Sequence, residues 1–235
     1  SSMAVSIVVL VFCMLVTGTH ILAAPSSGGH LVVAVPIDPD TFDPHKAVAA
    51  GTKEIDFNIY EGLVSFDSKG QIIPALATSW EVSPDGTVYT FHIRDNVLFH
   101  NGRKLTIDDV FYSLERIRDE ATGYTQPWPK EILELEIVDD NTLKLVLAAP
   151  YAPFLSELVD AAIIPKEALD DLATKPVGTG PFKLVEWVTG QHVELSKFAD
   201  YWQDGLPYLD GATFKIMPDP TTAILNLKAR TVHVI

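Results

Sequence analysis

Residues 80–94 read WEVSPDGTVYTFHIR, a stretch that predicts a β-hairpin. At its centre, Pro84 presets φ and Gly86 permits a positive φ, and together they favour a tight turn. Over residues 88–93, apolar residues alternate with more polar ones, a period of two that is typical of a strand with one buried and one wetter face. His92 falls on the wetter face, so we interpret it as a surface residue rather than a ligand.

Working outward, the sequence predicts a capped helix and a second hairpin. Thr106-Ile107-Asp108-Asp109 resembles a capping box with Asp in place of the usual Glu. Apolar residues follow it at helical spacing through Ile117. Two alternating apolar runs, 133–137 and 143–147, then flank Asp139-Asp140-Asn141 and indicate another hairpin.

Shorter patterns predict the remaining elements. Upstream, the apolar run 31–35 predicts a buried strand, and Thr52 is a candidate cap for a helix running to Tyr60. The downstream predictions are a helix at 153–159, a strand at Ile163–Ile164, a helix from Pro165, strands at 182–187, 193–198 and 214–217, and a helix over 221–229 with Ala223, Ile224 and Leu227 inward. Because hairpins mix with isolated helices and no βαβ period appears, we predict an α+β (mixed α/β) fold.

Composition excludes one class of partner. The chain has 235 residues, of which 31 are acidic and 17 basic, for a net charge of −14. A nucleic-acid-binding protein needs basic patches that displace counterions from phosphate, and no Lys/Arg cluster occurs. We therefore predict no nucleic-acid partner, and we interpret the acidity as favouring solubility.

The first residues resemble a secretion signal. Residues 3–16 are almost all apolar, and small residues follow up to Ala24. We expect 1–24 to be a signal peptide cleaved after Ala24, with an uncleaved membrane anchor as the alternative. Residues 25–30 are expected to form a flexible tether. The single cysteine, Cys13, lies inside the apolar run, so the folded part offers no disulfide and no Cys-rich zinc site.

No pattern of a catalytic or metal centre appears. The chain has no Gly-x-Ser-x-Gly motif, and no two histidines lie three to five residues apart. Gly178-Thr179-Gly180 is followed by Pro181, which has no N–H to offer a phosphate, so we interpret it as a tight backbone turn. We predict that the protein is not an enzyme and uses no cofactor or metal.

Three carboxylates lie among prolines, at Asp38, Asp40 and Asp43. They form either a solvated loop or a set of charges that rigid backbone presents at a cleft, where proline lowers the entropy cost of holding them still. The residues alone leave both interpretations open.

Several motifs, in this order and spacing, resemble the peptide/nickel/oligopeptide-binding family of ABC-importer solute receptors, solute-binding family 5. The motifs are Thr41-Phe42-Asp43-Pro44, Ile59-Tyr60-Glu61-Gly62-Leu63-Val64, Pro74-Ala75-Leu76-Ala77-Thr78-Ser79-Trp80-Glu81, Phe99-His100-Asn101-Gly102, Pro176-Val177-Gly178-Thr179-Gly180-Pro181-Phe182 and Asp200-Tyr201-Trp202.

The resemblance implies a type 2 periplasmic-binding fold, in which two lobes close on a ligand. Residues 31–235 would form the N-terminal lobe, with a hairpin and helix subdomain inserted at approximately 62–175 and the second lobe absent from the chain. The implied function is capture of a short peptide or similar small solute, outside the cytoplasm, by a monomer that serves the permease subunits of an ABC importer. The alternative is a sensory or structural module built on the same lobe.

The resemblance also implies site residues. Asp38-Pro39-Asp40 matches the family's extended stretch beside the ligand, and Tyr124 lies where some peptide-binding members place a cleft tyrosine. The alternative for Tyr124 and Trp128 is ordinary surface packing. Arg230 stands where the family has glycine, and arginine tolerates a positive φ poorly.

Overall fold

The structure is a computed structural model that describes residues 26–235. The predicted signal peptide and Cys13 lie outside these residues. Within residues 26–235, none of the helices combines the length and apolarity that a membrane span requires.

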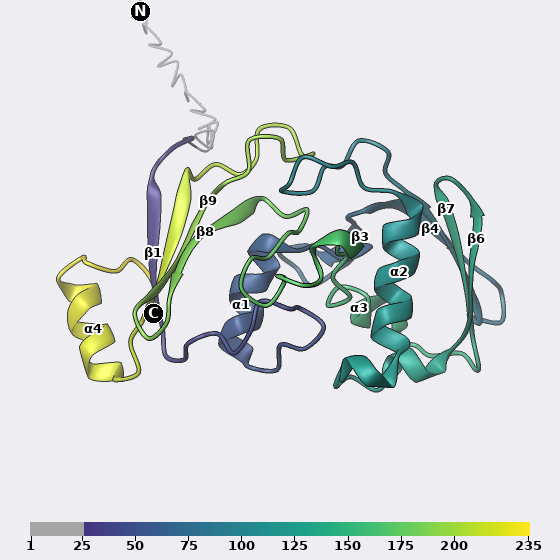
Figure 1. Cartoon of the computed structure of the whole chain (residues 1–235), viewed down its shortest axis with the longest axis horizontal. Coiled ribbons are helices and arrows are strands. Elements are labelled where there is room, and N and C mark those ends of the chain that lie inside the picture. The colour runs from purple at the N-terminus through teal and green to yellow at the C-terminus, as the bar shows by residue number, and fades with distance from the viewer. Residues whose placement is uncertain (1–25) are drawn as a thin grey trace, which may run out of the picture.

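One sheet joins the two ends of the described chain. Its strands lie in the order β1 (His30–Val35), β10 (Gly211–Ile216), β9 (His192–Lys197) and β8 (Phe182–Val188). β1 pairs with β10 in parallel, and the other two pairs are antiparallel. Figure 1 shows this sheet at one end of the molecule, with α4 (Pro220–Lys228) beside β1.

The second sheet contains both predicted hairpins. Its antiparallel strands lie in the order β4 (Ala77–Val82), β5 (Val88–Ile93), β7 (Thr142–Leu147) and β6 (Ile132–Asp139). One face packs against α2 (Ile107–Arg118), and alternate residues of β5 and β7 fill the core between them. Figure 1 places this unit at the other end of the molecule.

The remaining elements are shorter. They are α1 (Ala50–Ile59), the two-stranded antiparallel sheet of β2 (Val64–Phe66) and β3 (Ile72–Pro74), α3 (Phe154–Glu157) and three 3₁₀ turns at Glu120–Thr122, Trp128–Glu131 and Lys166–Ala168. The α1 helix lies between the sheets (Figure 1) and buries Ile55 and Ile59 completely. The predicted mixed α/β fold is confirmed, whereas the boundaries of the inserted subdomain stay a prediction.

Three local predictions were wrong, and two predicted helical segments are shorter than expected. The α1 helix begins at Ala50, and Thr52 is buried inside it with its hydroxyl donated to Asp40. Residues 163–164 form no strand, because their amides donate to the Glu61 carbonyl and the Ser113 hydroxyl instead of to a ladder. The segments after 153 and 165 form only a four-residue helix and a 3₁₀ turn. In α4, Ile224 and Leu227 are 43% and 36% exposed, since only Ala223 lies against the sheet.

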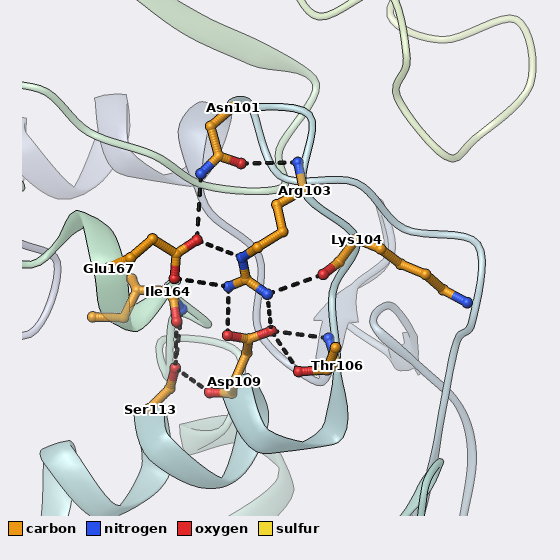
Figure 2. A network of polar contacts seen from close by, with 8 residues as sticks. All are labelled: Asn101, Arg103, Lys104, Thr106, Asp109, Ser113, Ile164 and Glu167. Carbon is orange, nitrogen blue, oxygen red and sulfur yellow. Dashed lines mark hydrogen bonds and ion pairs between the residues drawn. The ribbon is translucent and has the colours of Figure 1, made fainter.

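The predicted capping box is present, and Arg103 extends it into a network (Figure 2). The Asp109 carboxylate accepts the Thr106 amide at 2.9 Å. Arg103 donates to both Asp109 oxygens, at 2.9 and 2.6 Å, and also to Glu167. Ser113 connects the same helix to Ile164, whose amide it accepts at 2.9 Å. These hydrogen bonds join the start of α2 to residues 164–167, which follow the second sheet in the sequence.

The Gly178-Thr179-Gly180 turn lies directly against the end of α1. The Gly180 amide donates to the Ile59 carbonyl at 2.9 Å. A Cβ on Gly178 would lie 2.0 Å from the Ile59 oxygen, so this position has no room for a side chain. Neither glycine has a positive φ. This segment therefore needs glycine because the two backbones approach each other closely.

We expect Gly178→Ala to lower the free energy of unfolding by about 2–4 kcal/mol, because backbone must move to admit the methyl group. Gly51→Ala is the control, since its Cβ would meet only ordinary contacts of 3.5 Å or more in α1. There alanine should be neutral or stabilise by up to about 1 kcal/mol. Urea unfolding followed by circular dichroism measures both, and equal effects would contradict the close-approach explanation.

Candidate functional site

The three carboxylates of the proline-containing segment all have partners within the chain. Asp38 accepts the Trp187 indole N–H at 3.0 Å and the Gly190 amide at 2.7 Å, which ties the segment to the β8–β9 turn. Asp40 accepts the Thr52 hydroxyl at 2.8 Å and thus lies at the start of α1. Pro39 between them is buried. The segment is therefore rigid because its own acidic side chains brace it.

Asp43 forms a buried ion pair with Arg116 of α2. The two Arg116 Nη atoms donate to the Asp43 oxygens at 2.9 and 2.6 Å, and both side chains are less than a tenth exposed. Burial alone would raise the pKa of Asp43, but the hydrogen bonds and charge of Arg116 hold that pKa below its ordinary value.

His45 completes this cluster as a neutral imidazole. Its Nδ1 accepts from Arg116 at 2.8 Å, since arginine can only donate, so Nε2 carries the proton and donates to the Ala162 carbonyl at 2.8 Å. Burial lowers the pKa of His45 to about 4. The cluster thus fixes α2 and the segment around Ala162 against the start of the chain.

A small pocket opens between α1 and residues 159–162. It is lined by Pro44, Lys53, Asp56, Phe57, Tyr60, Glu61, Val159, Asp160 and Ala162. Lys53 on α1 pairs with Asp160 at 2.8 Å, and both side chains are partly exposed. Phe57 is 54% exposed and also lines a larger groove that continues past β2 and β3. The Lys53 ammonium, the Asp160 carboxylate and the Phe57 ring therefore all line this pocket.

Asp56 lies in this pocket without a partner. It is 5% exposed, and neither carboxylate oxygen has a hydrogen-bond partner among residues 26–235. Burial raises the pKa of Asp56 well above its ordinary value, and the neighbouring carboxylates of Asp40 and Asp160 add to this despite the charge of Lys53. Buried polar side chains nearly always have a partner, so an orphaned carboxylate marks a position where a donor is missing.

Glu61, which lines the same pocket, differs from Asp56 because its carboxylate has hydrogen-bond partners. Its carboxylate accepts the Thr179 hydroxyl at 2.9 Å, the Tyr201 hydroxyl at 2.8 Å and the Trp202 indole N–H at 3.0 Å. Burial raises the pKa of Glu61, while these hydrogen bonds lower it. Glu61 is therefore a satisfied structural carboxylate.

Tyr124 and Trp128 are the other described residues with buried polar side-chain atoms that lack partners. Their rings meet edge to face with centroids 6.1 Å apart, and Tyr124 meets His45 in the same manner at 6.3 Å. Burial raises the pKa of Tyr124, and the charges of Asp160 and Glu157 raise it further. Neither Tyr124 nor Trp128 lines the pocket that contains Lys53 and Asp160.

The sequence analysis named Asp38, Pro39, Asp40 and Tyr124 as ligand-binding residues, and none of them lines this pocket. It did not name Lys53, Asp56 or Asp160. The sequence signal for Asp56 was its position four residues after Thr52, which places a carboxylate on the side of α1 that also carries Ile55 and Ile59. Asp160 gave no local signal, because only the tertiary fold brings it to Lys53.

One cluster outside the pocket has metal-ligand chemistry. Glu186, His192 and Glu194 place ligand atoms within 4.8 Å of one another. Cross-strand pairing creates the cluster, since Glu186 lies opposite Glu194 on β8 and β9. A search for closely spaced histidines could not detect it.

Comparison with known proteins gives consistent matches. Residues 71–235 match the family described as bacterial extracellular solute-binding proteins, family 5, middle region. The glutathione-binding protein GsiB of Shigella boydii serotype 4 (strain Sb227) is 34% identical over 205 residues, which are 84% of this chain and 40% of that protein. The dipeptide-binding protein of Escherichia coli (strain K12) is 32% identical over 238 residues, with 88% and 44% covered.

A solved structure agrees with these sequence matches. The ABC transporter-associated periplasmic binding protein DppA from Helicobacter pylori, in complex with peptide STSA, has a TM-score of 0.80 and 35% identity over 88% of this chain and 46% of that chain. The chain therefore spans less than half the length of each of these relatives.

We expect Arg116→Met to destabilise the fold by about 3–5 kcal/mol, because it leaves the buried Asp43 carboxylate without its charge partner. Lys175→Met is the control, since Lys175 and Asp171 form an exposed pair. Its removal should change stability by at most about 0.5 kcal/mol. Urea unfolding at neutral pH measures both, and a loss below about 1 kcal/mol for Arg116→Met would contradict the assigned role.

Asp56→Asn should change stability in a pH-dependent manner. Because the folded-state pKa of Asp56 is raised, the stability it contributes is complete below about pH 4 and is lost as pH rises through that folded-state pKa. The variant should therefore equal the parent near pH 4 and be more stable by about 1 kcal/mol or more near pH 8. Thermal melts across this range test it against the exposed Glu54→Gln, and a pH-independent difference would refute the explanation.

Proposed function

Because the chain belongs to the bacterial extracellular solute-binding proteins of family 5, we propose that it is one lobe of a receptor that captures a short peptide or similar small solute for an ABC importer. The observation that carries the proposal is the pocket between α1 and residues 159–162, where Asp56 keeps both carboxylate oxygens unpartnered next to a larger groove that Phe57, Tyr60 and Glu61 also line. Such groups are the fixed polar contacts that orient a ligand in a largely preformed site.

The chemistry of the pocket suits a peptide. A short peptide carries both charges and a chain of amides, and the pocket offers the Lys53 ammonium, the Asp160 carboxylate and the unpaired Asp56 carboxylate. Relatives of this chain are named for glutathione and dipeptides, and the H. pylori structure contains peptide STSA. These names support a peptide-like solute as the ligand class.

We further propose that the stretch Asp38-Pro39-Asp40 borders the ligand as a rigid edge. The carboxylates of Asp38 and Asp40 hold the stretch in place. Ile37 beside them is 54% exposed and available for contact. In this arrangement Tyr124 supplies its unpartnered hydroxyl to the solute.

Closure needs a second lobe. The relatives are more than twice as long as the matched region, and we propose that 31–235 forms the first lobe, with approximately 62–175 as an inserted subdomain. Capture by closure requires no reacting group, so we propose a monomeric binding protein rather than an enzyme. The family's extracellular description supports a location outside the cytoplasm, where the permease subunits of an importer are the partners.

Nuclear magnetic resonance of the isotopically labelled chain tests the proposed function. Alanyl-alanine, tri-alanine and glutathione should shift the amide signals of residues 53–57, 124–128 and 159–162, with affinities in about the millimolar range because only half of the site is present. The β6–β7 turn at residues 140–141, which has no part in the proposed site, should not respond. No shift with any of the three, or shifts confined to other regions, would sink the proposal.

Tyr124→Phe should weaken peptide binding by about 2–10-fold, the effect of one lost hydrogen bond, without destabilising the chain. The hydroxyl has no partner within the described residues that its removal could orphan. Tyr208→Phe, at an exposed position, is the control and should bind as the parent does. Unchanged affinity for Tyr124→Phe would exclude its hydroxyl from the site.

A further inference from the structure

We propose that Glu186, His192 and Glu194 form a zinc site on the outer face of the sheet that contains β8 and β9. Its basis is the juxtaposition of one imidazole and two carboxylates, whose ligand atoms all lie within 4.8 Å of one another. The proposal replaces the sequence-based prediction of no metal. It does not rest on the proposed function, because the solute pocket lies elsewhere in the fold.

A bulge in β8 brings the three side chains to one face. Leu184 lies opposite Leu195, and the next pair on the outer face is Glu186 with Glu194. Between these two pairs β8 has one more residue than β9, and the extra residue turns Glu186 away from the core. His192 lies two residues before Glu194 and therefore shares its face. The opposite face of both strands packs into the core that α1 also enters, so the cluster faces away from the solute pocket.

The two glutamates form an unfavourable pair unless a positive charge lies between them. Like charges directly opposite each other on neighbouring strands destabilise a sheet. Glu194 is only partly exposed, and its carboxylate has no ion pair with a side chain of residues 26–235. Lys215 lies opposite His192 on β10 and faces the same side, but within this part of the chain it forms no ion pair either. A bound cation would remove the repulsion.

The distance between His192 and Glu186 fits a shared metal ion better than a hydrogen bond. Nε2 of His192 lies 3.4 Å from Oε2 of Glu186, which is longer than the roughly 2.7–3.2 Å of an N–H···O hydrogen bond. Zn²⁺ holds imidazole nitrogen and carboxylate oxygen at about 2.0–2.2 Å in a tetrahedron, so two ligands of one ion lie about 3.4 Å apart. Three protein ligands leave the fourth position to water.

The ion would join an edge strand to its neighbour. β8 is the last strand of its sheet and pairs only with β9 (Figure 1). A zinc ion held by both strands would cross-link them beside the bulge, where the ladder of hydrogen bonds is interrupted. The alternative is that these charges only prevent the edge from pairing with another chain, and the experiment distinguishes the two.

The first arm of the test titrates the untagged chain with zinc chloride by calorimetry and by nuclear magnetic resonance. We expect one ion per chain with a dissociation constant in about the micromolar range, and shifts centred on the amides of residues 186, 192 and 194. Magnesium chloride should not reproduce them, because Mg²⁺ prefers oxygen ligands and keeps its water. His192→Gln should weaken zinc binding by about 100-fold or more. The matched control is His92→Gln, since the His92–Glu81 pair at 3.8 Å has no third ligand among the described residues.

The second arm uses Glu194→Gln, which removes a ligand and the repulsion together. Without metal, the variant should be as stable as the parent or more stable. Zinc at a hundredfold excess over its dissociation constant should raise the melting temperature of the parent by about 5 °C or more and leave that of the variant unchanged.

Two results would overturn the inference. If zinc does not bind, or binds His192→Gln as well as the parent, the charges act only as protection of the edge. If zinc and magnesium give equal shifts, the cluster is a non-specific acidic surface. Neither result bears on the proposed function, which the peptide titrations test separately.

Discussion

The arrangement of the pocket depends on one buried guanidinium group. Arg116 comes from α2, the helix of the second sheet's unit, and it binds Asp43 and His45 in the segment that follows β1. His45 in turn donates a hydrogen bond to the carbonyl of Ala162, which lines the pocket. Because a buried arginine must keep its partners, these three segments cannot shift independently. The mouth of the pocket therefore has a fixed width, although its two sides are more than a hundred residues apart in sequence.

The same region contains a buried carboxylate that has no hydrogen-bond partner within the described residues. Most buried carboxylates of the described chain are satisfied, as Asp109 is by Arg103 and Glu61 is by three donors. Asp56 is not, and it lines the pocket, whereas Tyr124 and Trp128, which also have unpartnered polar atoms, pack against each other outside it. An unsatisfied carboxylate in a pocket is typical of a site whose partner comes from elsewhere.

Local chemistry made much of the fold predictable. The turn at Pro84-Asp85-Gly86 and the capping box at Thr106 rest on interactions within a few residues, and both occur as predicted. The predictions that depend on tertiary context were wrong. Residues 163–164 have strand-like composition, yet their amides bind Glu61 and Ser113. Ile224 and Leu227 have the spacing of an inward face, yet only Ala223 meets the sheet. Tyr124, which a resemblance suggested, does not line the pocket, and the pairing of Lys53 with Asp160 in the pocket has no local signature.

The parallel pairing of β1 with β10 has a consequence for how the chain acquires its structure. Residues 30–35 find their partner only at 211–216, so the first sheet closes across a very long loop. Contacts of such sequence separation slow folding, because the entropy of loop closure must be lost before the contacts form. The hairpins and α2 rely on nearby residues and can form first. During synthesis, β1 lacks this partner until residues 211–216 have emerged, and in that interval its open edge is accessible to a chaperone or a neighbouring chain.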